Sequence, residues 1–256
     1  MITIKSKEEI DFLRKGGKRL GAILKMVAER VSPGISTRAL DEFAHSLITK
    51  NSDIPSFLNY QPHGADRPYP ATTCLSINEE IIHGIPNEDE KILKEGDIVG
   101  IDIGLIHEGV FLDSAITVGV GEIDESAKKL IRATREALEA GIKAARGGGN
   151  VGDIGHAIET LVKGSGFSLA DGLSGHGVGR AVHEDPYVPN MGRKGEGPLL
   201  KPGMVLAIEP MLNEGTSKIK LLKDGYTYVT ADGTRSAHFE HTVVITEGAP
   251  IVVTRI

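Results

Sequence analysis

The sequence predicts an α+β protein built from two halves of similar design. Two ten-residue segments carry this prediction, LKEGDIVGID at Leu93–Asp102 and LKPGMVLAIE at Leu200–Glu209. They repeat leucine, lysine, glycine, an apolar run, isoleucine and a final acid in register, and a His-x-x-Pro motif precedes each, at His83 and His183. An internal repeat of this kind indicates a duplicated structural unit. Chance agreement within a glycine-containing pattern is the alternative explanation.

A second pair of similar segments extends the repeat toward the start of each half. PGISTRALDEFAHSLI, from Pro33, is similar to GGNVGDIGHAIETLV, from Gly148, and in both a glycine turn leads into an amphipathic helix. We therefore expect a single domain over residues 1–256, with repeat units at roughly 1–121 and 122–256. A pseudo-twofold axis would relate the units and would bring the two strand acids to a common pocket between them.

Within each half the sequence places helices before strands. Ser6-Lys-Glu-Glu9 is a capping box ahead of apolar residues at helical spacing, and this helix is expected to end at Pro33-Gly34. The proline-containing stretch 51–69 has little periodicity and is predicted to be a surface loop. The other expected elements are a helix at 40–48, strands at 72–77, 98–105 and 110–120, a helix at 126–145, and a second series of helix and strands that finishes at 240–253.

Composition narrows the class of protein. The net charge is −6 and basic residues are scattered, so neither a nucleic-acid-binding surface nor a polybasic membrane segment is indicated. The apolar runs are too short to span a bilayer, and MITIKSKEEI has acids where a signal peptide has its apolar core, which favours a cytoplasmic protein. The single cysteine, Cys74, excludes an internal disulfide and a cysteine-rich zinc module, so a bound metal would have oxygen and nitrogen ligands.

Two acids interrupt the apolar strands of the first half. Asp102 is flanked by isoleucines, and Asp113 follows a leucine on the returning strand. A hairpin turn centred between His107 and Glu108 would place Asp102 directly opposite Asp113, with both carboxylates on one face. Opposed buried acids destabilise a sheet unless a cation lies between them, so a metal site is favoured. The alternative is a solvated face on which both acids are harmless.

The second half offers a histidine and two further acids. His176 lies in the glycine-rich turn SGHGVG, Glu209 ends the second decapeptide, and Glu240 starts a strand rich in β-branched residues. Each alone is more often a solvated or hydrogen-bonded group than a ligand. Together with Asp102 and Asp113 they form a set of four carboxylates and one imidazole, which suits two adjacent divalent ions. Such a donor set accommodates Mn, Fe, Co or Zn.

These residues resemble the type I methionine aminopeptidases and, more widely, the pita-bread-fold metallopeptidases. The matching motifs, in family order, are NEEIIHGIP, IDIG, LDSA, SGHGVG, VHEDP, IEPM and FEHT, and the similarity extends over nearly the whole chain. The resemblance implies two halves around a central antiparallel sheet covered by helices. It also implies metal ligation by Asp102, Asp113, His176, Glu209 and Glu240, with Asp113 and Glu240 bridging two divalent ions.

The resemblance further implies an activity. It is the removal of the initiator methionine from nascent proteins whose second residue is small, by attack of a metal-bridging water or hydroxide on the first peptide bond. Glu209 would accept the proton of the water and pass it to the departing amine, and His183 would donate a hydrogen bond to the carbonyl oxygen. His83 would steady the scissile amide. For the two histidines, satisfying backbone groups near a proline turn is the alternative role.

The chain departs from the family around the methionine pocket. Family members have a compact Tyr-x-Gly-Tyr/Phe-Pro run, whereas here Tyr60 and Tyr69 are separated by QPHGADRP. Tyr69 and Cys74 keep their places, Val182 replaces a frequent phenylalanine, and Tyr226 occupies the position of a frequent tryptophan. Methionine is flexible and polarisable, so such a pocket is still expected to accept it.

Two other functions fit parts of the sequence. An Xaa-Pro peptidase on the same fold would generally carry a further N-terminal domain and further histidines, and a catalytically inactive binding protein would generally have lost ligands. We expect neither function, because the chain has no room for such a domain and all five ligand positions are kept. The expected partners are the N-termini of nascent polypeptides and, transiently, the ribosome by family analogy, with no DNA or membrane partner and a monomeric chain.

Overall fold

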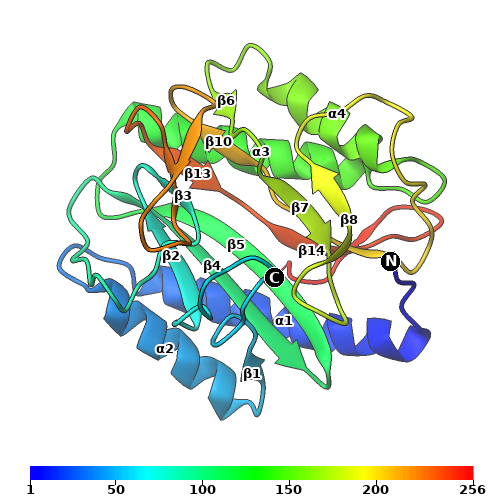
Figure 1. Cartoon of the computed structure of the whole chain (residues 1–256), viewed down its shortest axis with the longest axis horizontal. Coiled ribbons are helices and arrows are strands. Elements are labelled where there is room, and N and C mark those ends of the chain that lie inside the picture. The colour runs from blue at the N-terminus through cyan, green and yellow to red at the C-terminus, as the bar shows by residue number, and fades with distance from the viewer. Residues whose placement is uncertain (256) are drawn as a thin grey trace.

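In the computed structural model, which describes residues 1–255, the strands lie between two pairs of helices (Figure 1). Helices α1 (Lys7–Glu29) and α2 (Thr37–Lys50) cover one side, and α3 (Glu125–Ala144) and α4 (Val151–Val162) cover the other. The predicted α+β class is therefore confirmed, with one helix pair contributed by each half.

The capping box that the sequence predicts is present at the start of α1. The Ser6 hydroxyl accepts a hydrogen bond from the Glu9 N–H, and the Glu9 carboxylate accepts one from the Ser6 N–H. The helix ends earlier than expected, with Arg30 as its C-cap rather than at Pro33-Gly34. A turn at Pro33-Gly34, in which the Ile35 N–H donates to Ser32 O at 3.2 Å, then leads toward α2.

The strands form two larger sheets and two smaller ones. In the first half, β4 (Ile98–His107) pairs with β5 (Val110–Gly119) along one edge and with β2 (Thr73–Ile77) and β1 (Ile54–Pro55) along the other. In the second half the order is β15 (Ile251–Val252), β14 (His241–Val244), β9 (Val205–Ile208), β7 (Ser174–Gly177), β8 (Glu184–Pro189). The smaller sheets contain β3 (Glu80–Ile82), β12 (Tyr228–Thr230) and β11 (Ile219–Leu221), and β6 (Ser168–Leu169), β10 (Met211–Asn213) and β13 (Ser236–His238).

The β4–β5 hairpin corrects the predicted register. His107 pairs with Val110 across a two-residue turn, Glu108-Gly109, in which both residues have positive φ, +50° and +80°. A turn of this kind matches the twist of the strands, and glycine adopts positive φ without strain. Asp102 consequently lies opposite Ala115, and the prediction that it lies directly opposite Asp113 is wrong. The pairing differs by two residues, so the two acids still share one face.

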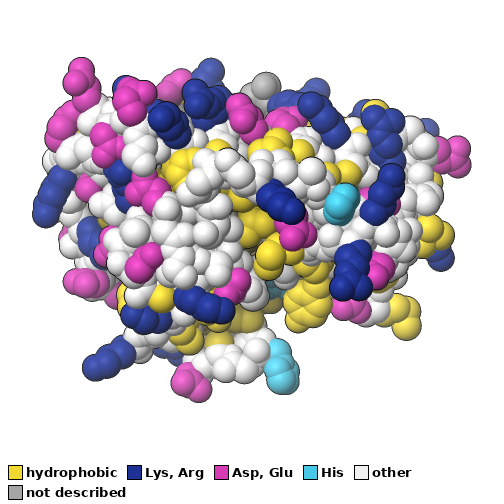
Figure 2. All heavy atoms as spheres, turned by 90° about the horizontal axis from the view of Figure 1, so that it is seen from above, with side chains coloured by type: hydrophobic (Ala, Val, Ile, Leu, Met, Phe, Trp, Pro, Cys, Tyr) yellow, Lys and Arg dark blue, Asp and Glu magenta, His cyan; other side chains and the backbone are white. Residues whose placement is uncertain are grey.

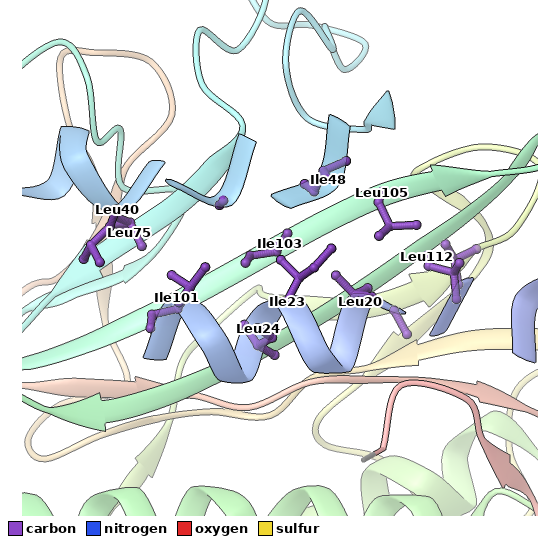
Figure 3. Packing of buried hydrophobic residues seen from close by; sticks show 14 of the residues in the cluster. Leu20, Ile23, Leu24, Leu40, Ile48, Leu75, Ile101, Ile103, Leu105 and Leu112 are labelled. Carbon is purple, nitrogen blue, oxygen red and sulfur yellow. The ribbon is translucent and has the colours of Figure 1, made fainter. Parts of the chain in front are cut away.

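Alternation along β4 separates the core from the acid-bearing face. Ile101, Ile103 and Leu105 are fully buried, and Figure 3 shows them beside the α1 residues Leu20 and Ile23. Asp102 projects from the opposite face because successive side chains of a strand alternate. The isoleucines that flank Asp102 therefore fix its direction by burying their own side chains against α1.

The repeated decapeptides occupy equivalent positions in the two halves. The Gly96 N–H donates to Val120 O at 3.0 Å, and the Gly203 N–H donates to Ile245 O at 2.9 Å. Both glycines have a φ close to +90°, in a turn that starts the following strand. The repeated Leu-Lys-x-Gly pattern thus encodes one local structure, a tight turn followed by a buried strand, with an acid six residues after the glycine in both halves.

The two halves meet where β5 runs beside the segment before β14. Ala115 and Glu240, which occupy equivalent places in the two halves, exchange backbone hydrogen bonds of 3.4 and 2.8 Å. Equivalent residues that bond each other lie on either side of a twofold axis. Glu240 is therefore next to the pseudo-twofold axis. Asp113 lies two residues before Ala115, the partner of Glu240 on β5.

Two buried threonines repeat one arrangement across this axis. Thr242 Oγ1 accepts a hydrogen bond from the Asp113 N–H (3.0 Å) and donates to Asp113 O (2.7 Å). Thr117 Oγ1 does the same with His238, accepting from N–H and donating to O, both at 2.9 Å. Each threonine replaces a missing strand-to-strand backbone bond, so the junction between the halves has no unpaired polar backbone at these points.

Thr242→Val should destabilise the protein by about 2 kcal/mol, because the change leaves the Asp113 N–H and C=O buried without partners. Thr117→Val should have a similar cost for the same reason. Urea unfolding of both variants measures the effect. Thr49→Val, at an exposed helical position, is the matched control. Equal stability of all three variants would show that the threonines do not join the halves.

The surface is of mixed charge. Figure 2 shows lysine and arginine side chains interspersed with acidic ones over the face that it presents. Among residues 1–255, no helix contains an apolar segment of the length that a membrane crossing requires.

Candidate metal centre and substrate pocket

The five predicted ligands come from five separate segments and converge on one cavity. Its lining includes Asp102 on β4, Asp113 on β5, His176 on β7, Glu209 just after β9, and Glu240 just before β14. Ligand atoms of Asp113, His176 and Glu240 all lie within 4.8 Å of one another, and all three side chains are buried. His176 Nε2 is 3.3 Å from Glu209 Oε1, which connects the fourth ligand to this group.

Several carboxylate oxygens in this cluster have no hydrogen-bond partner. Asp102 Oδ1, Asp113 Oδ1 and Glu240 Oε1 are buried and unpaired in the structure. Among the described residues, no lysine or arginine lines the cavity. A buried carboxylate without a partner costs several kcal/mol, so the cluster needs a cation for stability near neutral pH. Four carboxylates and one imidazole fit divalent metal ions, and the residues present therefore suit the group that the motifs imply.

Burial and mutual repulsion disfavour the charged forms of these acids. Burial raises the pKa of Asp102 to about 7, with a further contribution from the charge of Glu209. Burial also raises the pKa of Asp113, Glu209 and Glu240 well above the ordinary range, and neighbouring carboxylates add to the effect. A bound divalent cation would reverse this balance, because it favours the ionised form of each ligand.

His176 is oriented for ligation. Its Nδ1 lies 2.9 Å from Gly177 O, so this nitrogen donates to the backbone and Nε2 is left with a lone pair facing the acids. Metal-binding histidines are commonly fixed in this way. Burial lowers the pKa of His176 to about 3, which keeps the imidazole neutral as a ligand must be.

His83 and His183 line the same cavity as the five ligands. The ring of His183 is edge-on to that of His176, with 4.4 Å between centroids. His83 has a φ of +59°, an uncommon backbone conformation for a histidine, and its pKa is lowered to about 4 by burial and then by the nearby His183. Both histidines are therefore neutral hydrogen-bonding groups beside the acids at neutral pH.

The apolar wall of the cavity contains all four predicted pocket residues. Tyr69, Cys74, Val182 and Tyr226 are buried and pack in one cluster. The Tyr69 ring meets the Tyr226 ring edge-on at 5.1 Å. Phe57 belongs to the same cluster and lines the cavity, although the sequence analysis did not include it. The prediction that 51–69 is a surface loop is wrong for Phe57 and Tyr69, because both rings are buried against this cavity.

The longer loop does not displace Tyr69. Asn59 N–H donates to Tyr69 O (2.9 Å) and Tyr69 N–H donates to Tyr60 O (2.8 Å), so residues 61–68 leave and return at one point. Arg67 anchors this segment through two hydrogen bonds. Its guanidinium donates to Glu88 at 2.7 Å, and its C=O accepts from the Tyr226 hydroxyl. These bonds let the eight residues form a closed loop beside the pocket, and within this loop Pro62 lines the cavity.

Sequence reasoning missed two residues that contact Glu209. Asn190 Nδ2 donates to Glu209 O at 3.1 Å, and His238 Nε2 is 3.5 Å from Glu209 Oε2. His238 precedes Glu240 by two residues, a spacing that places two side chains on one face of a strand. That spacing is the only signal in the sequence that could have found it.

The fold and this donor set define a metallopeptidase class: two similar halves bring carboxylates and an imidazole to the end of a pocket with an apolar wall. The chain belongs to metallopeptidase family M24, whose model matches residues 11–247. It is 48% identical over its whole length to a methionine aminopeptidase of Clostridium perfringens, and 43% identical to methionine aminopeptidase 1 of Bacillus subtilis, with full coverage of both chains in each case.

Solved structures confirm the pita-bread fold. The methionine aminopeptidase of Thermotoga maritima superimposes with a TM-score of 0.94 at 42% identity, covering all of both chains. A prolidase of Pyrococcus horikoshii gives a TM-score of 0.74 at 22% identity, which is a likeness of fold. The match covers 98% of this chain but 63% of the prolidase. The prolidase therefore has a part that this chain does not match.

Proposed function

We propose that this chain removes the N-terminal methionine from polypeptides whose second residue is small. The observation that carries the proposal is the position of the unpaired carboxylates of Asp102, Asp113 and Glu240 at the end of a pocket walled by Tyr69 and Tyr226. A metal site next to an apolar pocket suits a substrate with an amine and an apolar side chain at its first residue. The names of the relatives, 43 to 48% identical over their full length, support the same activity.

The metal complement is proposed to be two divalent ions. Asp102, Asp113, His176, Glu209 and Glu240 would hold them, with Asp113 and Glu240 shared, because these two lie at the centre of the cluster beside the pseudo-twofold axis. When bound, such ions supply Lewis-acid activation of water and of the scissile carbonyl at neutral pH. Mn, Fe, Co and Zn all tolerate this set of oxygen and nitrogen ligands.

The protein's own groups would move the proton and position the peptide bond. Glu209 accepts the proton of the attacking water and transfers it to the departing amine. His183 donates a hydrogen bond to the carbonyl oxygen, whose negative charge grows during attack. His83 holds the amide of the scissile bond. All three side chains line one cavity with the acids, so one substrate can touch them together.

The pocket wall would select methionine. Tyr69, Cys74, Val182 and Tyr226 provide apolar and sulfur contacts for a thioether side chain. The free amine of the first residue would enter the metal centre, which restricts cleavage to the first peptide bond. The side chains of His83 and His183 would border the second residue of the substrate and would favour a small one.

The biological setting is proposed on the same basis. The substrates would be nascent polypeptides in the cytoplasm, with a transient contact to the ribosome, and with neither DNA nor a membrane as partner. The chain would act as a monomer and as a single domain, residues 1–256, whose repeat units span roughly 1–121 and 122–256.

Chelator-stripped protein should release no methionine from a Met-Ala-Ser peptide, and activity should return when Mn, Fe, Co or Zn is added singly. The measurement is free methionine per unit time, with the metal content of each sample determined. An Ala-Pro dipeptide is the matched control for the Xaa-Pro alternative and should not be cleaved. Full activity of stripped protein would rule out the metal-dependent mechanism, and cleavage of Ala-Pro alone would favour the alternative function.

A further inference from the structure

The His183 ring has a hydrogen-bond partner that the proposed chemistry does not use. The Tyr60 hydroxyl is 2.8 Å from His183 Nδ1, and the two rings are tilted by 47° with 5.4 Å between centroids. Tyr60 also lines the cavity that holds the acids. The two residues are far apart in the chain, so the tertiary structure alone creates the contact.

We propose that Tyr60 is a positioning residue that holds His183 with its proton on Nε2, so that Nε2 can donate to the scissile carbonyl oxygen. This inference rests on the proposed function, in which His183 donates that bond. A neutral imidazole carries one N–H, so Nε2 can donate only when Nδ1 accepts. The Tyr60 hydroxyl is the group placed to donate to Nδ1.

Tyr60 is suited to be the donor in this pair. Its hydroxyl keeps its proton at neutral pH, because burial raises the pKa of Tyr60 above the ordinary value for tyrosine. His183 also packs edge-on against His176, with an angle of 71° between the planes. The neighbouring ring thus restricts the direction of the imidazole, and the Tyr60 hydroxyl sets its tautomer.

The backbone holds Tyr60 in place. Its N–H donates to Phe57 O at 2.9 Å, and its C=O accepts from the Tyr69 N–H at 2.8 Å. Tyr60 and Tyr69 therefore flank the segment 61–68 at its closed base, and within that segment Pro62 also lines the cavity. Because these hydrogen bonds close the base of the loop, the position of Tyr60 does not depend on how many residues the loop contains.

Tyr60→Phe removes one oxygen atom and keeps the ring. We expect kcat for Met-Ala-Ser to fall on the order of tenfold to hundredfold, the size of effect known for removing the group that orients a metal-binding histidine. KM should change by about twofold or less, because the pocket for methionine is intact. Thr49→Val, which removes an exposed hydroxyl on α2, is the control and should keep both constants. An unchanged kcat in Tyr60→Phe, or a rise in KM alone, would overturn the proposal.

A double-mutant cycle separates positioning from a general structural effect. If Tyr60 acts through His183, Tyr60→Phe should have no further effect on kcat in a His183→Ala background. Additive losses in the double variant would overturn the proposal. Melting temperatures of the single variants, measured in parallel, report any loss of stability that accompanies the change.

The tautomer can also be observed without measuring activity. Histidine ¹⁵N spectra of the zinc-loaded enzyme should show His183 protonated at Nε2 in the wild type, and a mixture of tautomers or the Nδ1-protonated form in Tyr60→Phe. His183→Ala identifies the resonances. A wild-type His183 protonated at Nδ1 would overturn the positioning role even if methionine release is normal. If the wild type shows the expected tautomer but releases no methionine, the proposed function fails while the contact is upheld.

Discussion

Replacing Asp113 or Glu240 by alanine should lower the rate of methionine release on the order of a thousandfold. These two side chains lie at the centre of the ligand cluster, within 4.8 Å of each other and of His176. Loss of either removes a ligand shared by both proposed ions and so removes Lewis-acid assistance worth several kcal/mol. Since about 1.4 kcal/mol corresponds to a tenfold change in rate, a loss of this size is expected. The measurement is kcat/KM for Met-Ala-Ser at saturating metal.

Two matched variants control for the removal of a carboxylate. Asp11→Ala and Glu136→Ala change exposed acids on α1 and α3 and should leave the rate unchanged. The site variants should remain folded, because each change removes a buried carboxyl group that lacks a hydrogen-bond partner on one oxygen and so costs stability in the metal-free protein. Near-normal activity of Asp113→Ala would show that the chemistry does not depend on this cluster.

Metal-stripped protein should lose stability as the pH rises above about 7, and bound metal should abolish this loss. Burial raises the pKa of Asp113, Glu209 and Glu240 far above the ordinary value, so in this range the folded protein holds protons that the unfolded chain has released. The contribution of these acids to stability is then largest at low pH, and it is lost as the pH rises through their pKa in the folded protein. The slope is about 1.4 kcal/mol per pH unit for each such proton.

The histidines limit the pH window in which this prediction applies. Burial lowers the pKa of His176 and of His238 to about 3, so below about pH 6.5 they oppose the carboxylates: the unfolded chain binds their protons and stability falls as the pH falls. Above that pH only the acids contribute. Thermal unfolding of stripped and metal-loaded protein between pH 7 and 9 measures the effect.

Asp113→Asn provides the matched comparison for the pH prediction. The amide keeps the shape of the side chain but carries no titratable proton, so the slope of stability against pH should become shallower in stripped protein. If stripped wild-type protein is equally stable at pH 7 and pH 9, burial does not raise the pKa of these acids in the folded protein, and the prediction is wrong. If added metal leaves the slope unchanged, the ions do not bind at these acids.

The main elements of the fold were predictable because their signals are local. The Ser6 to Glu9 capping box, the amphipathic stretch that forms α3 and the alternation of apolar residues around Asp102 each depend on neighbours a few residues away. The repeated decapeptides were equally readable, since a turn glycine at Gly96 or Gly203 is required by its own backbone conformation.

The chemistry of the acids was also readable from the chain. An acid within an apolar strand needs a partner wherever the strand lies. The sequence around Asp102 and Asp113 therefore predicts a cation site without knowledge of the fold. The motif order then linked these acids with His176, Glu209 and Glu240, and the structure brings all five to one cavity. The sequence by itself therefore determined the elements, the duplication and the kinds of donor atoms.

Only the tertiary structure decided how these parts fit together. The two-residue turn at Glu108-Gly109 moved Asp102 from opposite Asp113 to opposite Ala115, a difference that hydrophobic alternation could not reveal because both registers bury the same face. The burial of Phe57, the contact of His238 with Glu209 and the bond from Tyr60 to His183 join residues from distant segments. Such contacts depend on how the whole chain packs, and a local pattern carries no information about them.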